Sequence, residues 1–157
     1  METKTNVMRI LDAHRISYHE YCYLGTGAIS GVEVADVLKQ NPNQVFKSLV
    51  TVSKDKKHYV FLVPVAKELD LKKCAKAVSE KNIEMIPQKE LLGLTGYVHG
   101  GCSPIGLKKE FPVVIDSSAK NFETIIFSAG KIGYQVEVAL EDLKKVIPYG
   151  MANIARE

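Results

Sequence analysis

The chain has 157 residues, of which 46% are apolar and 25% charged, and its formal net charge is +3 at pH 7. This length and composition predict one globular domain, residues 1–157, that is large enough to bury a proper core. The sequence contains no apolar run of the length that a bilayer span requires and no signal-peptide pattern at its start, so we expect a cytoplasmic protein without a membrane partner.

The numbers and spacing of cysteine, histidine and arginine argue against disulfides, metal or cofactor sites, and readout of DNA sequence. The three cysteines form no C-x-x-C pair and the four histidines have no metal-ligand spacing, so we expect no disulfide framework, no metal and no cofactor. Only three of the 21 basic residues are arginine. Because arginine forks read DNA bases whereas lysine acts as a point charge toward phosphates, we expect no readout of DNA sequence.

The first half of the chain predicts short helices and strands from caps and apolar spacing. Ser30-x-x-Glu33 has the pattern of a capping box ahead of an apolar helix face. The elements expected here are a helix from an Asn6 cap to about Arg15, a strand Ile16–Tyr23, a mobile loop Leu24–Ser30, a helix to about Gln40, a strand Gln44–Ser53 and a strand His58–Val65.

The strand Gln44–Ser53 carries apolar residues on both faces, which indicates a strand covered on both sides. Lys47 interrupts this pattern on the face of Val45 and Leu49. Lysine is seldom buried without a partner, because desolvating its ammonium group is costly. Lys47 is therefore either a lysine at the edge of the sheet that reaches solvent or part of a functional site.

The second half begins with the clearest helix of the chain, which Asp70 is expected to cap and which makes Cys74 a core thiol. The element order shows no strict strand-helix alternation, so we predict the α+β class, with a mixed, strongly curved sheet and helices packed around it. The remaining expected elements are a strand Ile83–Ile86, a helical turn from Pro87 that Gly93 ends, strands Val113–Asp116, Glu123–Phe127 and Tyr134–Val138, and a closing helix Glu141–Ile147.

Glycine is concentrated in one stretch, since five of the eleven glycines fall within Gly93–Lys109. The run Gly100–Gly106 has neither helical nor strand periodicity. A loop of this kind can direct consecutive backbone N–H groups at one point and so form an anion or oxyanion pocket. The alternative is a crowded turn between two strands. A second glycine loop, Ser128–Gly133, joins the last two expected strands.

Three separated stretches resemble signatures of one protein family: Val45–Val50 (VFKSLV), Gly100–Gly106 (GGCSPIG) and Ser128–Gly133 (SAGKIG). They are similar to the bacterial Cys-tRNA(Pro) deacylases of the YbaK/EbsC type, whose superfamily includes the editing domain of prolyl-tRNA synthetases. The resemblance covers nearly the whole chain. It implies a barrel-like mixed sheet flanked by helices and a trans-acting editing enzyme that removes cysteine from mischarged Cys-tRNA(Pro), extending to Cys-tRNA(Cys).

The resemblance also implies the site residues. It gives catalytic roles to Lys47, Gly101 and Ser128, and substrate-binding roles to Tyr23, Gly100, Cys102, Ser103, Pro104 and Gly130. Tyr18 and Tyr21 are alternatives to Tyr23, and Gln135 stands where relatives often carry an acidic residue.

In the resembled family the thiol of the substrate attacks its own acyl carbonyl, so the protein needs no nucleophile. The expected roles are then to hold the reactive conformer and to stabilise charge, through backbone N–H groups near Gly101 and Cys102 and through Lys47 toward the tRNA end. The implied partners are the 3′ aminoacyl end of a mischarged tRNA and a prolyl- or cysteinyl-tRNA synthetase.

Three alternatives remain open from the sequence. Cys102 and His99 could form the nucleophile and base of a cysteine hydrolase, because a thiol in a glycine loop lies three residues from a histidine. The chain could also deacylate Ala-tRNA(Pro). Finally, it could be a catalytically silent module that binds a tRNA end or a nucleotide.

Overall fold

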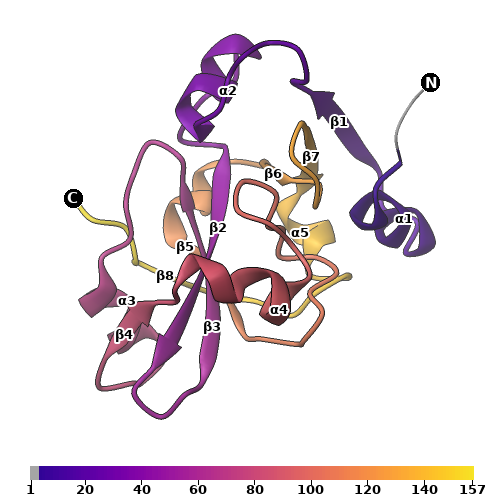
Figure 1. The fold of residues 1–157 in the computed structure, drawn as a ribbon. Coiled ribbons are helices and arrows are strands. Elements are labelled where there is room, and N and C mark those ends of the chain that lie inside the picture. Colours follow the sequence, from indigo (N-terminus) through magenta and orange to yellow (C-terminus); the bar gives the residue numbers. More distant parts are fainter. Residues whose placement is uncertain (1–3) are drawn as a thin grey trace.

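Short helices and strands alternate irregularly along the chain (Figure 1), in a computed structural model that describes residues 4–157. No helix within these residues is long and apolar enough to cross a membrane. The elements are α1 Asn6–Ala13, β1 Tyr18–Cys22, α2 Gly31–Val37, β2 Phe46–Ser53, β3 His58–Pro64, α3 Leu71–Ala77, β4 Ile83–Met85, η1 Gln88–Glu90, α4 Leu91–Thr95, β5 Val113–Asp116, η2 Ser117–Asn121, β6 Thr124–Ser128, β7 Tyr134–Ala139, α5 Leu140–Leu143 and β8 Gly150–Ala152.

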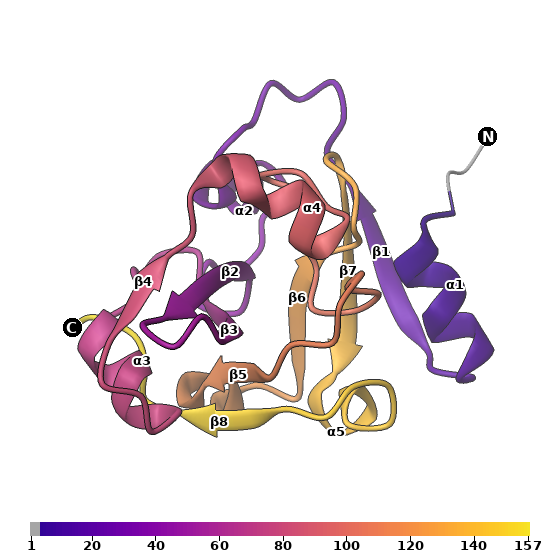
Figure 2. The ribbon, with the colours of Figure 1, turned by 60° about the horizontal axis from the view of Figure 1, so that its bottom comes forward.

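The strands form two sheets that lie side by side in Figure 2. One sheet has the antiparallel order β1-β7-β6, and the other has the order β4-β2-β3-β5-β8, in which β5 runs parallel to both β3 and β8. They meet at a single bridge between Val45 and Ile126. The α+β class with mixed, curved sheets is confirmed, but the strands do not close into one barrel because this bridge is too short to continue the ladder.

The pair β2 and β3 is covered on both faces, as the apolar pattern predicts. One face contributes Phe46, Val50, Val60 and Leu62 to the main core, which also contains apolar side chains of α1, β6 and β7. The opposite face packs against α3 through a second cluster that contains Phe61, Val63, Cys74 and Ala75. Burial of each large side chain of this kind contributes about 1.5–3 kcal/mol, so this hairpin is the most strongly anchored part of the sheet.

Local sequence signals place most helix ends correctly. Ser30 accepts a hydrogen bond from the Glu33 N–H, and the Glu33 carboxylate accepts one from the Ser30 N–H, which confirms the capping box at α2. Asp70 accepts hydrogen bonds from the N–H groups of Lys72 and Lys73 at the start of α3, and Cys74 is fully buried as expected.

Two predicted helix boundaries are wrong. Thr5, not Asn6, caps α1, because Thr5 has an extended backbone and its hydroxyl accepts the Met8 N–H, whereas Asn6 is already helical. Helix α4 continues through Gly93 to Thr95, and Gly96 ends it in the left-handed conformation. In both cases a nearby residue that is equally able to cap a helix forms the cap: Thr5 at the start of α1 and Gly96 at the end of α4.

The C-terminal part differs more from expectation. Helix α5 covers only Leu140–Leu143 instead of Glu141–Ile147, and β8 is not predicted by the pattern. The last residues are held by Asp116, which is 3% exposed. One carboxylate oxygen of Asp116 accepts the N–H groups of Ile154 and Ala155, at 3.0 and 3.2 Å, and the other accepts the Ser118 hydroxyl at 2.5 Å. A polar side chain between strands therefore fixes the tail against the five-stranded sheet.

We predict that Asp116→Ala lowers the free energy of unfolding by about 3 kcal/mol, because two backbone N–H groups lose a buried, charged acceptor. Urea denaturation followed by circular dichroism measures this change. The matched control is Asp55→Ala in the exposed turn between β2 and β3, which should change stability by less than about 0.5 kcal/mol. Equal stability of the two variants would show that the tail does not depend on Asp116.

Candidate functional site

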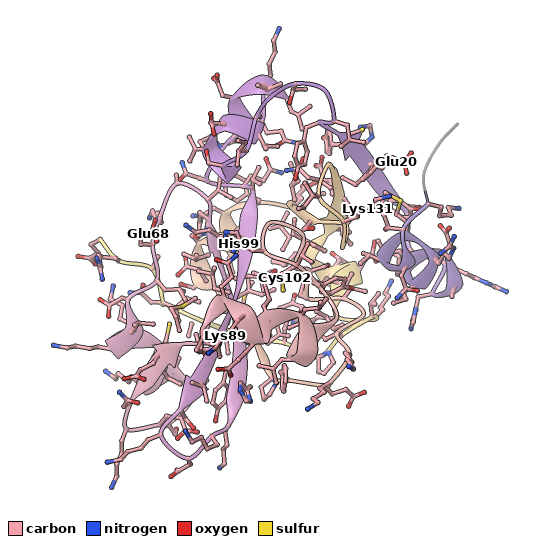
Figure 3. The ribbon with its side chains drawn as sticks, viewed as in Figure 1. Glu20, Glu68, Lys89, His99, Cys102 and Lys131 are labelled. Carbon is pink, nitrogen blue, oxygen red and sulfur yellow. The ribbon has the colours of Figure 1, made fainter. Side chains whose placement is uncertain are left out.

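A cavity of about 380 Å³ lies along one edge of β2, and it is the candidate site. Its wall comes from the start of α2, from β2, from the segment between β4 and α4, from the loop at residues 99–102, and from the facing ends of β6 and β7. In Figure 3 His99 and Cys102 lie near the centre of the view, with Glu68 to the left, Lys131 to the right and Lys89 below. The cavity is within the size range of small-molecule sites.

The structure brings together only part of the predicted set. Five of the nine predicted residues line the cavity: Tyr23, Lys47, Gly100, Cys102 and Ser128. The other four are not among its lining residues: Gly101, Ser103, Pro104 and Gly130. The predicted roles of all nine toward a substrate stay predictions, but the two groups contribute in different ways.

The buried turn of the glycine loop serves packing. The Gly101 N–H donates a hydrogen bond to the Val98 carbonyl at 3.0 Å, so this N–H already has a partner within the loop, and its role toward an acyl oxygen stays a prediction. A side-chain carbon at Gly101 would lie 3.2 Å from the backbone nitrogen of Ile132, so glycine lets the two glycine loops pack together. Ser103 is fully buried and its hydroxyl accepts the Ile105 N–H, and the neighbouring Pro104 is buried too.

Gly130 positions Ser128. Gly130 has φ +88°, and a side-chain carbon there would lie 2.9 Å from both Tyr97 and Val7, so this conformation and this packing require glycine. Its N–H donates to the Ser128 hydroxyl oxygen at 3.1 Å. The Ser128 hydroxyl thus accepts one hydrogen bond from the loop, and within residues 4–157 its proton has no acceptor. Ser128 can therefore donate a hydrogen bond to a ligand in the cavity.

Lys47 lies on the cavity wall and is not a buried charge. Its Nζ is 3.4 Å from the Glu68 carboxylate, and the exposed fractions of the two side chains are 30% and 72%. An ion pair this exposed contributes little to stability. Among the described residues that line the cavity there is no Asp or Glu, so the cavity carries a positive charge that no lining carboxylate neutralises.

Cys102 and His99 both line the cavity, but the structure does not pair them. Cys102 is 8% exposed, and burial raises the pKa of its thiol to about 12. His99 is exposed, and no hydrogen bond within residues 4–157 joins it to Cys102 or to an orienting carboxylate. A protonated, unpaired thiol is a poor nucleophile, so the geometry does not support a cysteine hydrolase.

Of the three tyrosines considered from the sequence, Tyr23 lines the cavity, and Tyr134 of β7 lines it as well. The Tyr21 hydroxyl instead donates to Glu137 at 2.6 Å, and Tyr18 packs against the main core. Gln135 also lines the cavity, is 6% exposed, and accepts a hydrogen bond at its Oε1 from Gln40 at 2.8 Å.

One lining residue, Ser48, was not identified from the sequence. Its hydroxyl oxygen is buried and has no hydrogen-bond partner within the described chain. The signal is present in the sequence, because Ser48 is a polar residue on the apolar face of Phe46, Val50 and Val52. Lys47 interrupts the opposite face in the same way, and its charge is a stronger signal of a site than the small hydroxyl of Ser48. No group of three or more His, Cys, Asp or Glu side chains within residues 4–157 could hold a metal ion.

The comparisons with known proteins agree on one family. A family model described as an aminoacyl-tRNA editing domain matches residues 28–146. A protein of Enterococcus faecalis, named as the Cys-tRNA(Pro)/Cys-tRNA(Cys) deacylase EbsC, is 43% identical over 89% of this chain and 86% of its own length. A proline–tRNA ligase of Lactobacillus gasseri is 26% identical over 68% of this chain, which matches only 19% of that ligase.

Solved structures show the same fold. A crystal structure described as a trans-editing enzyme for prolyl tRNA synthetase superposes with a TM-score of 0.82 at 20% identity, covering 99% of this chain and 100% of that chain. A hypothetical protein superposes with a TM-score of 0.86 at 17% identity, covering 96% of this chain and 99% of that chain.

We predict that only Cys22 reacts quickly with a thiol reagent such as DTNB in the native protein at pH 8. Cys22 is exposed, whereas burial raises the pKa of both Cys74 and Cys102 to about 12. With such a pKa only about one buried thiol in 10⁴ is ionised at pH 8. Cys22→Ala should remove the fast phase, and urea should expose the other two thiols. A fast phase that survives Cys22→Ala would show that a buried thiol is activated.

Proposed function

The chain belongs to the aminoacyl-tRNA editing domain family, and from this premise we propose that it is a trans-acting deacylase that removes cysteine from mischarged Cys-tRNA(Pro). The observation that carries the proposal is the single cavity that contains Lys47, Ser128 and Tyr23 and offers no ionised nucleophile. The name of the Enterococcus faecalis relative supports cysteinyl substrates and adds Cys-tRNA(Cys). The proposal includes a cytosolic location, where tRNA is charged.

A separate editing site that removes wrongly attached cysteine is needed for a physical reason. Cysteine and proline are close in size, and a difference of one or two methylenes in an apolar pocket discriminates by only about 1–3 kcal/mol. A synthetase therefore mischarges tRNA(Pro) at a low rate. A separate site can remove the error if it recognises a chemical property of cysteine that proline lacks, and the thiol is that property.

The proposed reaction uses the substrate's own sulfur. The thiol attacks the acyl carbonyl carbon, a C–S bond forms, and the ester C–O bond to the tRNA 3′-oxygen breaks. The thiol proton ends on the 3′-oxygen, so the products are a four-membered thiolactone and free tRNA. This route fits a cavity whose one lining thiol, Cys102, is held protonated by burial.

The protein then has two tasks. It must hold the aminoacyl group in the reactive conformer, and it must stabilise negative charge on the acyl and leaving oxygens. Ser128 has a hydroxyl proton free to donate, and Lys47 supplies a cation toward the 3′-oxygen or the adjacent phosphate. We further propose that a prolyl- or cysteinyl-tRNA synthetase presents the tRNA, since three arginines give this chain few planar phosphate contacts.

Deacylation of a substrate panel tests the function. We expect rapid release from Cys-tRNA(Pro) and Cys-tRNA(Cys), and slow release from Ala-tRNA(Pro) and from S-methyl-Cys-tRNA(Pro), because the last two lack a free thiol. Cys102→Ala should act at nearly the wild-type rate. Fast hydrolysis of the S-methyl ester would show that water or a protein group attacks, and complete loss of turnover in folded Cys102→Ala would support the cysteine hydrolase.

Lys47→Ala should lower kcat/KM by at least about 10²-fold, the scale typical of losing one preorganised charged group. Its free energy of unfolding should change by less than about 1 kcal/mol, because the ion pair with Glu68 is exposed. Lys47→Arg should restore little activity, since a planar guanidinium cannot occupy the volume of an ammonium group. The matched control is Glu68→Gln, which breaks the same ion pair and should keep its activity. If Lys47→Ala instead melts far below wild type with activity in proportion to folded protein, Lys47 is structural.

A further inference from the structure

The outer edge of β2 is covered only at its two ends. At one end Val45 bridges Ile126, and the Ile126 N–H donates to the Gln44 carbonyl at 3.1 Å. At the other end β4 pairs with Thr51–Ser53, and the Ile86 N–H donates to the Val50 carbonyl at 3.3 Å. Within the described chain no strand pairs with this edge in between, and the cavity occupies that gap.

The register shows which backbone groups face the gap. On the β3 side the Val65 N–H donates to the Val45 carbonyl and the Ser53 N–H donates to the Lys57 carbonyl. Odd-numbered residues of β2 therefore exchange hydrogen bonds with β3, and even-numbered residues direct their N–H and C=O groups to the opposite edge. Ser48 lies at the centre of the uncovered segment, so both of its backbone groups point toward the cavity.

The Ser48 side chain gives a second, independent indication of a ligand. Its hydroxyl oxygen is buried and has no hydrogen-bond partner within residues 4–157. A buried polar atom without a partner costs about 1–3 kcal/mol, and native proteins rarely retain one without a reason. By strand alternation the hydroxyl lies on the same face as Phe46 and Val50, which belong to the apolar main core.

We propose that Ser48 is the residue that binds the aminoacyl group, through its backbone N–H and C=O and through its hydroxyl. An α-aminoacyl ester carries an amino N–H donor and a carbonyl acceptor with the spacing found in one residue of a β-strand. It can therefore pair with Ser48 as a strand of one residue, with its amino group donating to the Ser48 carbonyl and its acyl oxygen accepting from the Ser48 N–H.

This pairing makes the Ser48 N–H a donor to the oxygen on which charge develops. That role was expected of Gly101, whose N–H is already bonded to Val98. Side chains of directly opposite residues lie on the same face of a sheet, about 4.5–5.5 Å apart at Cβ. The substrate side chain thus lies beside the Ser48 hydroxyl, which accepts the hydrogen bond of a thiol and finds no such donor in an alanyl group.

The inference rests on the proposed function for the identity of its ligand, so its test uses binding as well as turnover. The probes are stable adenosine analogues that carry a cysteinyl, alanyl or 3-mercaptopropionyl group in amide linkage at the 3′ position. Ser48→Ala should weaken binding of the cysteinyl analogue about 5–10-fold, the scale of one hydrogen bond, and should change binding of the alanyl analogue less than about twofold. Ser48→Thr, which keeps the hydroxyl, should bind as wild type does.

Stability separates binding from structure. Ser48→Ala should melt at the wild-type temperature or above it, because the hydroxyl that it removes has no partner. The matched control is Thr51→Val on the same strand, whose buried hydroxyl donates to the Tyr59 carbonyl at 3.0 Å. Thr51→Val should melt lower than wild type and bind all three analogues unchanged.

The backbone contacts are tested by amide NMR. The cysteinyl analogue should shift the Ser48 N–H strongly, and the 3-mercaptopropionyl analogue, which lacks the amino group, should bind about 5–10-fold more weakly. An unmoved Ser48 N–H at saturation, or equal binding of the analogues with and without the amino group, would overturn the inference. Deacylation that proceeds equally well in Ser48→Ala would also overturn it and leave the proposed function intact. Binding through Ser48 without deacylation of Cys-tRNA would overturn only the function.

Discussion

Incomplete pairing of β2 is the constraint on which the site depends. β2 pairs with β3 and β4 within its own sheet, and Val45, which directly precedes β2, bridges Ile126 of β6 in the other sheet. The two neighbours on its outer edge approach from opposite ends and do not meet. Backbone hydrogen-bonding groups in a protein interior require partners, so this gap must be filled by water or by a ligand. The fold therefore leaves backbone hydrogen-bonding groups of β2 directed into the cavity.

The electrostatics of the cavity depend on the absence of carboxylates among its described lining residues. Lys47 brings a cation, and its ion-pair partner within residues 4–157, Glu68, is an exposed residue outside the lining. A tRNA end brings phosphates and an ester whose oxygens gain negative charge as the ester breaks, and a cavity with a cation and no carboxylate among its described lining residues favours both. A carboxylate in the lining would oppose that charge. The wall is thus better suited to stabilise a leaving oxygen than to activate water.

The sequence predicts the local features of this protein well and its tertiary pairings poorly. Caps at Ser30 and Asp70 depend on side chains within three residues of the helix start, and strand alternation in β2 depends on burial of both faces, so both are readable from the pattern. β8 is different, because three residues after Pro148 form a strand only by pairing with β5. The unpaired edge at Ser48 cannot be predicted from the sequence either, because it depends on where the pairing of β2 with β4 and the bridge to β6 end.

The two glycine loops have a packing role that the family resemblance does not predict. Gly101 and Gly130 are required by close packing of the two loops against Ile132 and Tyr97, and this packing sets the shape of the cavity and the orientation of Ser128. In the proposed complex the hydrogen-bond donors to the ligand are the Ser128 hydroxyl and the N–H groups on the uncovered edge of β2. A motif can therefore mark residues that pack the wall of a site, while the proposed contacts with the substrate come from the strand of another motif, Val45–Val50. In the proposed arrangement the two loops form part of the cavity wall, and the edge of β2 contacts the aminoacyl group.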